Sequence, residues 1–259
     1  MNILKYILLL FWSSLIAQSS ITAKLQSKKP LKADILVDID NFDTQYITLN
    51  NEFYQNTLTG GFTYSNVQFG AITSANVFNP LKINLFYSDF NSAIILDNRL
   101  AEITKIDFNT LQPFRVATHI STGNDNTIWI YNQNTQQLEL FDYITNKSRV
   151  KTLPISGLVL DLKSDFNFCW LLTKEHLFVY NYFGSLIEKF PNEGFTKIEE
   201  NNGDLFLLKD NSLYFKAKNS SKTEPIELPG LLINQFLVTN ETLYIYADEM
   251  LHQFQLKTN

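Results

Sequence analysis

The sequence predicts an all-β fold in which a unit of about 40 residues recurs along the chain. Three observations support this prediction. Hydrophobic residues make up 45% of the 259 residues and aromatic residues 14%, so strand-forming side chains dominate. Apolar and polar residues alternate with a period of two, and helical periodicity is nearly absent. The alternating segments also return at a nearly constant spacing, which indicates a repeat.

The first 19 residues are predicted to form a signal peptide. Lys5 precedes a mostly apolar run from Tyr6 to Ala17, and Ala17 and Ser19 fit the two small positions of a cleavage site. The run is shorter than the roughly 20 apolar residues that a membrane-spanning helix needs. We therefore expect an exported protein, periplasmic or secreted, with one domain over residues 20–259 and no transmembrane segment after cleavage.

Six β-hairpins define the repeat. In the clearest of them, Asn124–Tyr143, turn-forming residues precede a strand around Trp129, a polar turn and a second strand. The hairpin centres are Tyr46, Leu85, Trp129, Trp170, Phe206 and Tyr244, and neighbouring centres are 36 to 44 residues apart. We expect the aromatic centres to pack between neighbouring units.

Further strand-like segments flank the hairpins and bring each unit to four strands. Residues 114–122 and 147–154 lie on either side of the Trp129 hairpin, and Pro154, Pro191 and Pro229 end three of the units. Four-stranded units of about 40 residues are the blades of β-propellers. The sequence therefore predicts a β-propeller of six four-stranded blades, with seven blades or an irregular partial propeller as alternatives.

Closure of such a ring requires a strand from outside the last repeat. The unit around Tyr244 supplies only three strands, and an open sheet edge promotes edge-to-edge pairing. Residues 20–28 place Ile21, Ala23 and Leu25 on one face, and we expect this segment, or part of residues 31–39, to pair beside the C-terminal strand. The alternative is that the basic residues 26–32 belong to a loose linker.

The repeats around Trp129, Trp170, Phe206 and Tyr244 resemble the blades of exported bacterial β-propellers with NHL-like, six-bladed repeats. Residues 31–259 as a whole resemble an uncharacterised family of such proteins. The resemblance implies the architecture and no reaction. The Gly-His and Trp-Asp signature of WD40 repeats is missing, and Asn146 stands where quinone-dependent dehydrogenase propellers have a glycine.

The candidate site lies at the ends of the predicted inner strands, because propellers place ligands over the central channel. Polar residues at or near these ends are Asp38, Asp40, His119, Asp161, Asp165, Glu199, Glu200 and Asn234. Among them, Asp38, His119, Asp161 and Glu199 are the candidate ligand-binding residues. Such groups bind a hard cation or perform general acid-base chemistry. Strand ends that face water carry the same residue types without a function.

Other features exclude several classes of function. A formal net charge of -5 without a clustered basic face disfavours a nucleic-acid partner. The three histidines, at positions 119, 176 and 252, lack zinc-site spacing, and the sequence has no GxSxG elbow or phosphate-binding glycine loop. Cys169 is the only cysteine, so no internal disulfide forms, and its apolar neighbours predict a small buried hydrophobic residue.

The sequence thus predicts a non-catalytic exported propeller that acts as a binding or scaffolding module. Its expected partner is an envelope or extracellular protein or glycan, and we expect a monomer without a cofactor. The alternative is a metal-assisted, lactonase-like hydrolase that holds a divalent cation such as calcium between carboxylates at the channel mouth.

Overall fold

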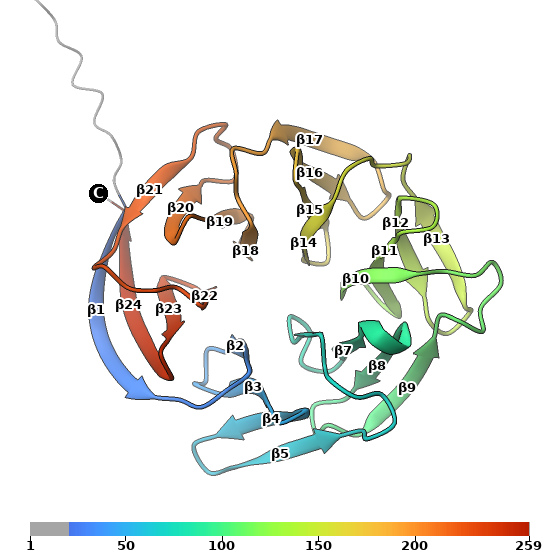
Figure 1. Ribbon diagram of the computed structural model, residues 1–259, viewed down its shortest axis with the longest axis horizontal. Coiled ribbons are helices and arrows are strands. Elements are labelled where there is room, and N and C mark those ends of the chain that lie inside the picture. The colour runs from blue at the N-terminus through green and yellow to red at the C-terminus, as the bar shows by residue number, and fades with distance from the viewer. Residues whose placement is uncertain (1–20, 259) are drawn as a thin grey trace, which may run out of the picture.

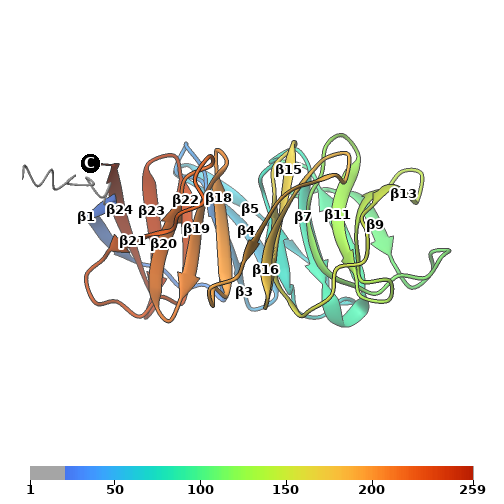
Figure 2. The same cartoon turned by 90° about the horizontal axis from the view of Figure 1, so that it is seen from above.

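The computed structural model describes residues 21–258, which form a ring of β-sheets around a central axis (Figure 1). Apart from one 3-10 turn, η1 (Ser88–Phe90), the regular structure of this range is β. Seen from the side, the strands run between the two faces of the ring (Figure 2). Residues 21–258 contain no helix with the length and hydrophobicity needed to span a bilayer. The predicted signal peptide, residues 1–19, lies outside the described residues.

Four sheets are separate and four-stranded, and in each the strands follow one another outward from the axis (Figure 1). The first contains β2 (Ile35–Ile39), β3 (Gln45–Leu49), β4 (Glu52–Thr57) and β5 (Gly60–Ser65). The second contains β6 (Ser74–Asn76), β7 (Ile83–Tyr87), β8 (Ser92–Leu96) and β9 (Glu102–Asp107). The third contains β10 (Ala117–Thr122), β11 (Thr127–Asn132), β12 (Gln137–Asp142) and β13 (Lys147–Lys151). The fourth contains β14 (Val159–Ser164), β15 (Phe168–Thr173), β16 (His176–Asn181) and β17 (Leu186–Pro191).

The remaining strands form one eight-stranded sheet. One half contains β18 (Lys197–Asn201), β19 (Asp204–Lys209), β20 (Ser212–Lys216) and β21 (Glu224–Glu227). The other half contains β22 (Gln235–Thr239), β23 (Thr242–Ala247), β24 (Met250–Thr258) and β1 (Ile21–Pro30). Only two residue pairs join β21 to β1, so the sheet divides into two four-stranded units. We number the units blades 1 to 6 in the order of their inner strands, β2, β6, β10, β14, β18 and β22.

Strand β1 closes the ring. It pairs antiparallel with β24 from Ile21 opposite Thr258 to Pro30 opposite Met250, with a bulge between Leu25 and Ser27. Ile21 is buried in the core between blades 5 and 6, whereas Leu25 is exposed. The predicted closure by residues 20–28 is therefore confirmed over its described part, and the linker alternative is wrong for residues 26–30.

The hairpin centres form the packing between blades, as predicted. Trp129 is 1% exposed and packs with Leu162 and Leu171 of blade 4. Trp170, Phe206, Tyr244 and Tyr46 likewise contact the blade that follows theirs. Leu85 differs, because it packs with Tyr46 of the preceding blade. Cys169 is fully buried in the cluster around Trp129, which confirms its interpretation as a small core residue.

Five of the inner strands were predicted, and one was missed. The inner strand of blade 2, β6, contains only Ser74, Ala75 and Asn76, and it pairs with β7 through three residue pairs. Three polar or small residues show no hydrophobic alternation, so the sequence gives this strand no period-two signal.

Candidate functional site

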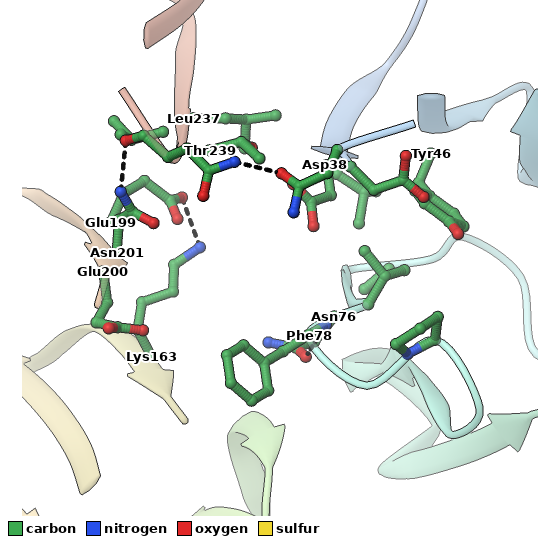
Figure 3. Close-up of a pocket in the computed structure, with 18 of the residues that line it drawn as sticks. Asp38, Tyr46, Asn76, Phe78, Lys163, Glu199, Glu200, Asn201, Leu237 and Thr239 are labelled. Atoms are coloured by element: carbon green, nitrogen blue, oxygen red, sulfur yellow. Dashed lines mark hydrogen bonds and ion pairs between the residues drawn. The ribbon is translucent and has the colours of Figure 1, made fainter. Parts of the chain in front are cut away.

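A cavity of about 320 Å³ opens where the inner strands end. Its lining comes from the ends of β2, β6, β14, β18 and β22, from the turns that follow them and from Tyr46 of β3 (Figure 3). These strands belong to blades 1, 2, 4, 5 and 6, so the cavity lies at one mouth of the channel. We call it the mouth cavity.

Blade 3 is separated from the mouth cavity by contacts between blades 2 and 4. The rings of Phe78 and Phe166, which follow β6 and β14, meet edge to face with centroids 5.0 Å apart. The Ser164 hydroxyl donates to Ser121 of β10 at 2.7 Å, and Thr122 of β10 donates to Asn76 Oδ1 at 2.6 Å. The ends of three inner strands are thereby tied together, and β10 contributes no residue to the lining of the cavity.

The floor of the mouth cavity is one layer of inner-strand residues. Asp38, Lys163, Glu199 and Leu237 line the cavity, and each pairs across its hairpin with the aromatic centre of its own blade. Ser121 holds the same position in blade 3, opposite Trp129. Because these residues occupy equivalent places in the repeat, the ring brings residues from distant parts of the sequence to one level of the channel.

An ion pair lies in this layer. Lys163 Nζ donates to Glu199 Oε1 at 2.6 Å, and the two side chains are 28% and 20% exposed. Burial opposes the charge on Lys163, but the carboxylates of Glu199, Asp161 and Asp38 outweigh it and raise the Lys163 pKa. The ammonium group is therefore charged: it contacts Glu199 and is attracted electrostatically by Asp161 and Asp38.

One ammonium group does not compensate three carboxylates. Burial raises the pKa of Glu199 to about 7, and the charges of Asp161 and Asp38 add to this effect against the attraction of Lys163. Burial also raises the pKa of Asp38, and it raises that of Glu200 to about 7. The mouth cavity thus holds carboxyl groups that bind protons near neutral pH.

The four predicted site residues are divided between two layers. Asp38 and Glu199 line the mouth cavity, whereas Asp161 and His119 do not. Asp161 and His119 pair with the residues two positions beyond the aromatic centres of blades 4 and 3, Leu172 and Tyr131. Two residues along a strand correspond to about 6.6 Å. The second pair therefore lies one layer deeper, toward the start of the inner strands.

The deeper layer has its own partners. Asp161 Oδ2 accepts a hydrogen bond from the Ile198 amide of β18 at 3.0 Å, and Oδ1 accepts from the Leu162 amide at 2.9 Å. Burial lowers the pKa of His119 despite the charge of Asp161, so the imidazole is neutral at pH 7. Asp161 thus joins the inner strands of blades 4 and 5 and supports the layer above.

Sequence reasoning missed Lys163, Phe78 and the amide side chains at the rim. In a sequence, a lysine near a strand end indicates a solvent-exposed side chain. The partner of Lys163 is 36 residues away, so the local sequence does not reveal the ion pair. Counting positions back from the Trp170 centre would have placed Lys163 at the level of Asp38 and Glu199. The rim amides are joined in a chain, since Asn201 Nδ2 donates to the Asn240 carbonyl and Asn240 Nδ2 to Asn41 Oδ1, both at 2.6 Å.

The hydrolase alternative would need carboxylates grouped around a divalent cation. Within residues 21–258, no three His, Cys, Asp or Glu side chains are grouped closely enough to hold a metal ion. Lys163 Nζ already lies among the carboxylates that would be the ligands. Asp40 in the adjacent turn accepts hydrogen bonds from the amides of Phe42 and Thr44, so its Oδ1 caps the turn.

Known proteins resemble this chain in structure, but the sequence comparisons found no match. No family model and no curated protein matches the chain. A catalytically inactive virginiamycin B lyase from Staphylococcus aureus, solved with quinupristin, superposes with a TM-score of 0.63 at 11% identity, covering 92% of this chain and 95% of that one. The WD40 domain of Neurospora crassa Pan2 gives 0.57 at 9% identity, covering 89% and 74%.

The fold is a β-propeller. A chain in a crystal structure of the mitotic checkpoint complex is also similar, with a TM-score of 0.61 at 10% identity and coverage of 90% and 91%. The structures that resemble this propeller include both a lyase and a WD40 domain. At these identities the likeness concerns the fold alone, and the function of this propeller depends on its own site.

The raised pKa of Glu199 leads to a prediction for stability. Its pKa is 4.5 ordinarily and about 7 in the folded protein. Between these values the folded protein binds more protons than the unfolded chain, so the contribution of Glu199 to the free energy of unfolding falls as pH rises. We compare the free energy of unfolding of Glu199→Gln with that of the wild type. The difference should shift in favour of the variant by roughly 1–3 kcal/mol as pH rises from about 5 to about 8.

Urea unfolding at several pH values measures this difference. Glu193→Gln is the control, because Glu193 is an exposed glutamate in the turn between blades 4 and 5. Its stability should follow the wild type across the range. A Glu199→Gln difference that stays constant with pH would contradict the prediction.

Proposed function

We propose that this propeller is a non-catalytic exported binding module whose mouth cavity holds part of a partner protein. The observation that carries the proposal is the mouth cavity itself, to which five of the six blades contribute side chains. Ligand pockets typically measure about 300–1,000 Å³. At about 320 Å³, the cavity suits a single side chain or a small chemical group.

The lining supports binding better than catalysis. Among residues 21–258 no histidine lines the cavity, so a base there would have to be a carboxylate such as Glu199. The Ser164 hydroxyl donates to Ser121, and the Thr239 hydroxyl donates to the Ile39 carbonyl at 2.7 Å. Neither hydroxyl is hydrogen-bonded to a general base, which an activated nucleophile requires.

Export is part of the proposal. Cleavage after Ser19 would leave β1 complete, because this strand begins at Ile21. We expect the mature protein to begin at Ser20, and mass spectrometry of the protein purified from its producing cell checks this. A chain that retains residues 1–19 in the mature form would contradict export with cleavage.

Site-specific cross-linking tests the binding role. We would replace Phe78 with the photoreactive residue benzoylphenylalanine, because Phe78 lies at the mouth cavity and its side chain is 43% exposed. Phe183 is the matched control, an aromatic residue that is 64% exposed in the turn between β16 and β17. We expect one recurrent adduct from the mouth position that the control position does not form.

The identity of the adduct decides between outcomes. A cross-linked peptide identified by mass spectrometry would support a protein partner. A cross-linked sugar would show that the partner is a glycan instead. Absence of any adduct from the mouth position under native expression conditions would overturn the binding role. Turnover of an ester or lactone panel that depends on Glu199 would instead favour a hydrolase.

A further inference from the structure

We infer that the group held in the mouth cavity is a basic side chain, lysine or arginine, of a partner protein. This inference rests on the proposed function and adds the chemistry of the ligand. Three properties of the cavity lead to it: the surplus of hydrogen-bond acceptors on its floor, the balance of charge around it, and the aromatic ring at its rim.

Acceptors on the floor of the cavity outnumber free donors. Asp38 Oδ1 accepts from the Ile39 amide, and Glu199 Oε1 accepts from Lys163. The second oxygen of each carboxylate, Asp38 Oδ2 and Glu199 Oε2, has no hydrogen-bond partner among residues 21–258. A ligand that donates several hydrogen bonds satisfies these atoms, as ammonium and guanidinium groups do.

The charge of the lining favours the same ligand. Among residues 21–258, Lys163 is the one basic residue that lines the cavity, and the acidic residues are Asp38, Asp40, Glu199 and Glu200. Carboxylates without a compensating cation retain protons near neutral pH, as the raised Glu199 pKa indicates. A second cation beside Lys163 would compensate them, and hydrogen bonds between charged groups are stronger than neutral ones.

Phe78 supplies the remaining contact. Its ring lies at the opening opposite Asp38 and beside Lys163 (Figure 3), and the edge-to-face contact with Phe166 holds it there. A cation or its alkyl chain packs favourably against an aromatic face. The protein uses this contact elsewhere, since Lys216 Nζ lies 4.3 Å from the ring centre of Phe190.

A neutral sugar fits the cavity less well. Sugar hydroxyls need donors as well as acceptors. The rim amides of Asn201 and Asn240 each use one of their two N–H donors on groups of the protein itself. Lys163 likewise uses one of its three on Glu199. The lining also carries the carboxyl groups of Asp38, Asp40, Glu199 and Glu200, and these favour a ligand that is charged and only donates.

Four probes test the inference on the mature protein, residues 20–259. Three are peptides with acetylated and amidated ends: acetyl-Gly-Lys-Gly-amide and the corresponding arginine and glutamine peptides. The fourth is maltotriose. Titrations of nitrogen-labelled protein followed by two-dimensional NMR give the affinities and locate the shifted amides. We expect the lysine or arginine peptide to bind at least about tenfold more tightly than the glutamine peptide, because charge-assisted hydrogen bonds are lost in the latter.

Variants assign the binding to the cavity. Asp38→Asn, Glu199→Gln and Phe78→Ala should each weaken the basic peptide by at least about fivefold, whereas the exposed Glu193→Gln should not. Circular dichroism verifies that each variant is folded. If Asp38→Asn unfolds, Phe78→Ala remains informative, since that side chain is at the rim.

Failure of the inference is distinguishable from failure of the proposed function. Equal or tighter binding of the glutamine peptide or maltotriose would overturn the basic ligand. A Phe78 cross-link to a neutral segment would do the same and would preserve the binding role. Absence of both cross-links and peptide binding would overturn the two together.

Discussion

Deletion of residues 21–30 should lower the melting temperature by more than about 10 °C. We expect the deletion to cost about 5 kcal/mol in the free energy of unfolding, and each kcal/mol lowers the melting temperature of a domain of this size by roughly 2–4 °C. The deletion removes β1, exposes the whole edge of β24 and opens the core in which Ile21 is buried. Nine residue pairs between β1 and β24 are lost, and a net hydrogen bond contributes about 0.5–1.5 kcal/mol.

Two further measurements keep this prediction testable if the deleted chain aggregates. A synthetic peptide of residues 20–31 added in trans should restore the melting temperature in a concentration-dependent way. Ile21→Ala should destabilise the intact protein, whereas Leu25→Ala should not, because the two side chains are 3% and 49% exposed on the same strand. An unchanged melting temperature after deletion would disprove closure by β1.

Trp129→Ala should lower the free energy of unfolding by about 3–5 kcal/mol, the usual cost of removing a large buried aromatic side chain. Trp129 packs between blades 3 and 4 with Leu162, Cys169 and Leu171. Neighbouring side chains fill the resulting cavity only in part, because they are held on paired strands. Urea unfolding measures the loss. The slope of the free energy of unfolding against urea concentration should be the same in the variant and the wild type.

Phe183→Ala is the matched aromatic control for Trp129→Ala. Phe183 is exposed in a turn, and surface substitutions change stability by about 0.5 kcal/mol or less. A Trp129→Ala loss no larger than that of the control would mean that the hairpin centres do not hold neighbouring blades together.

Local pattern was enough to predict most of the fold. Period-two alternation and the spacing of the aromatic centres located the hairpins, and the missing fourth strand of the last unit led to β1. The pattern failed at β6, whose three residues Ser74–Asn76 carry no apolar alternation. Such a strand forms because β7 offers a paired edge, and no local sequence signal reports that.

The candidate site was less predictable, because it depends on register. Asp38 and Glu199 were identified from their place near strand ends, but Asp161 and His119 lie one layer deeper. Bulges interrupt the pairing directly before Asp38, Asp161 and His119, so counting from a strand start gives the wrong level. Counting from the aromatic centre gives the correct one and also finds Lys163.

The pairing of β1 with β24 also determines how the propeller responds to force. Ile21 lies opposite Thr258, so the first and last described strands begin and end at the same point of the ring (Figure 1). Tension applied between the two ends of the domain therefore acts on one residue pair at a time, from Ile21 toward Pro30, and peels the strand instead of shearing it. The ring should open at low mechanical load while it remains stable in solution, and a tether through both ends would release the last blade first.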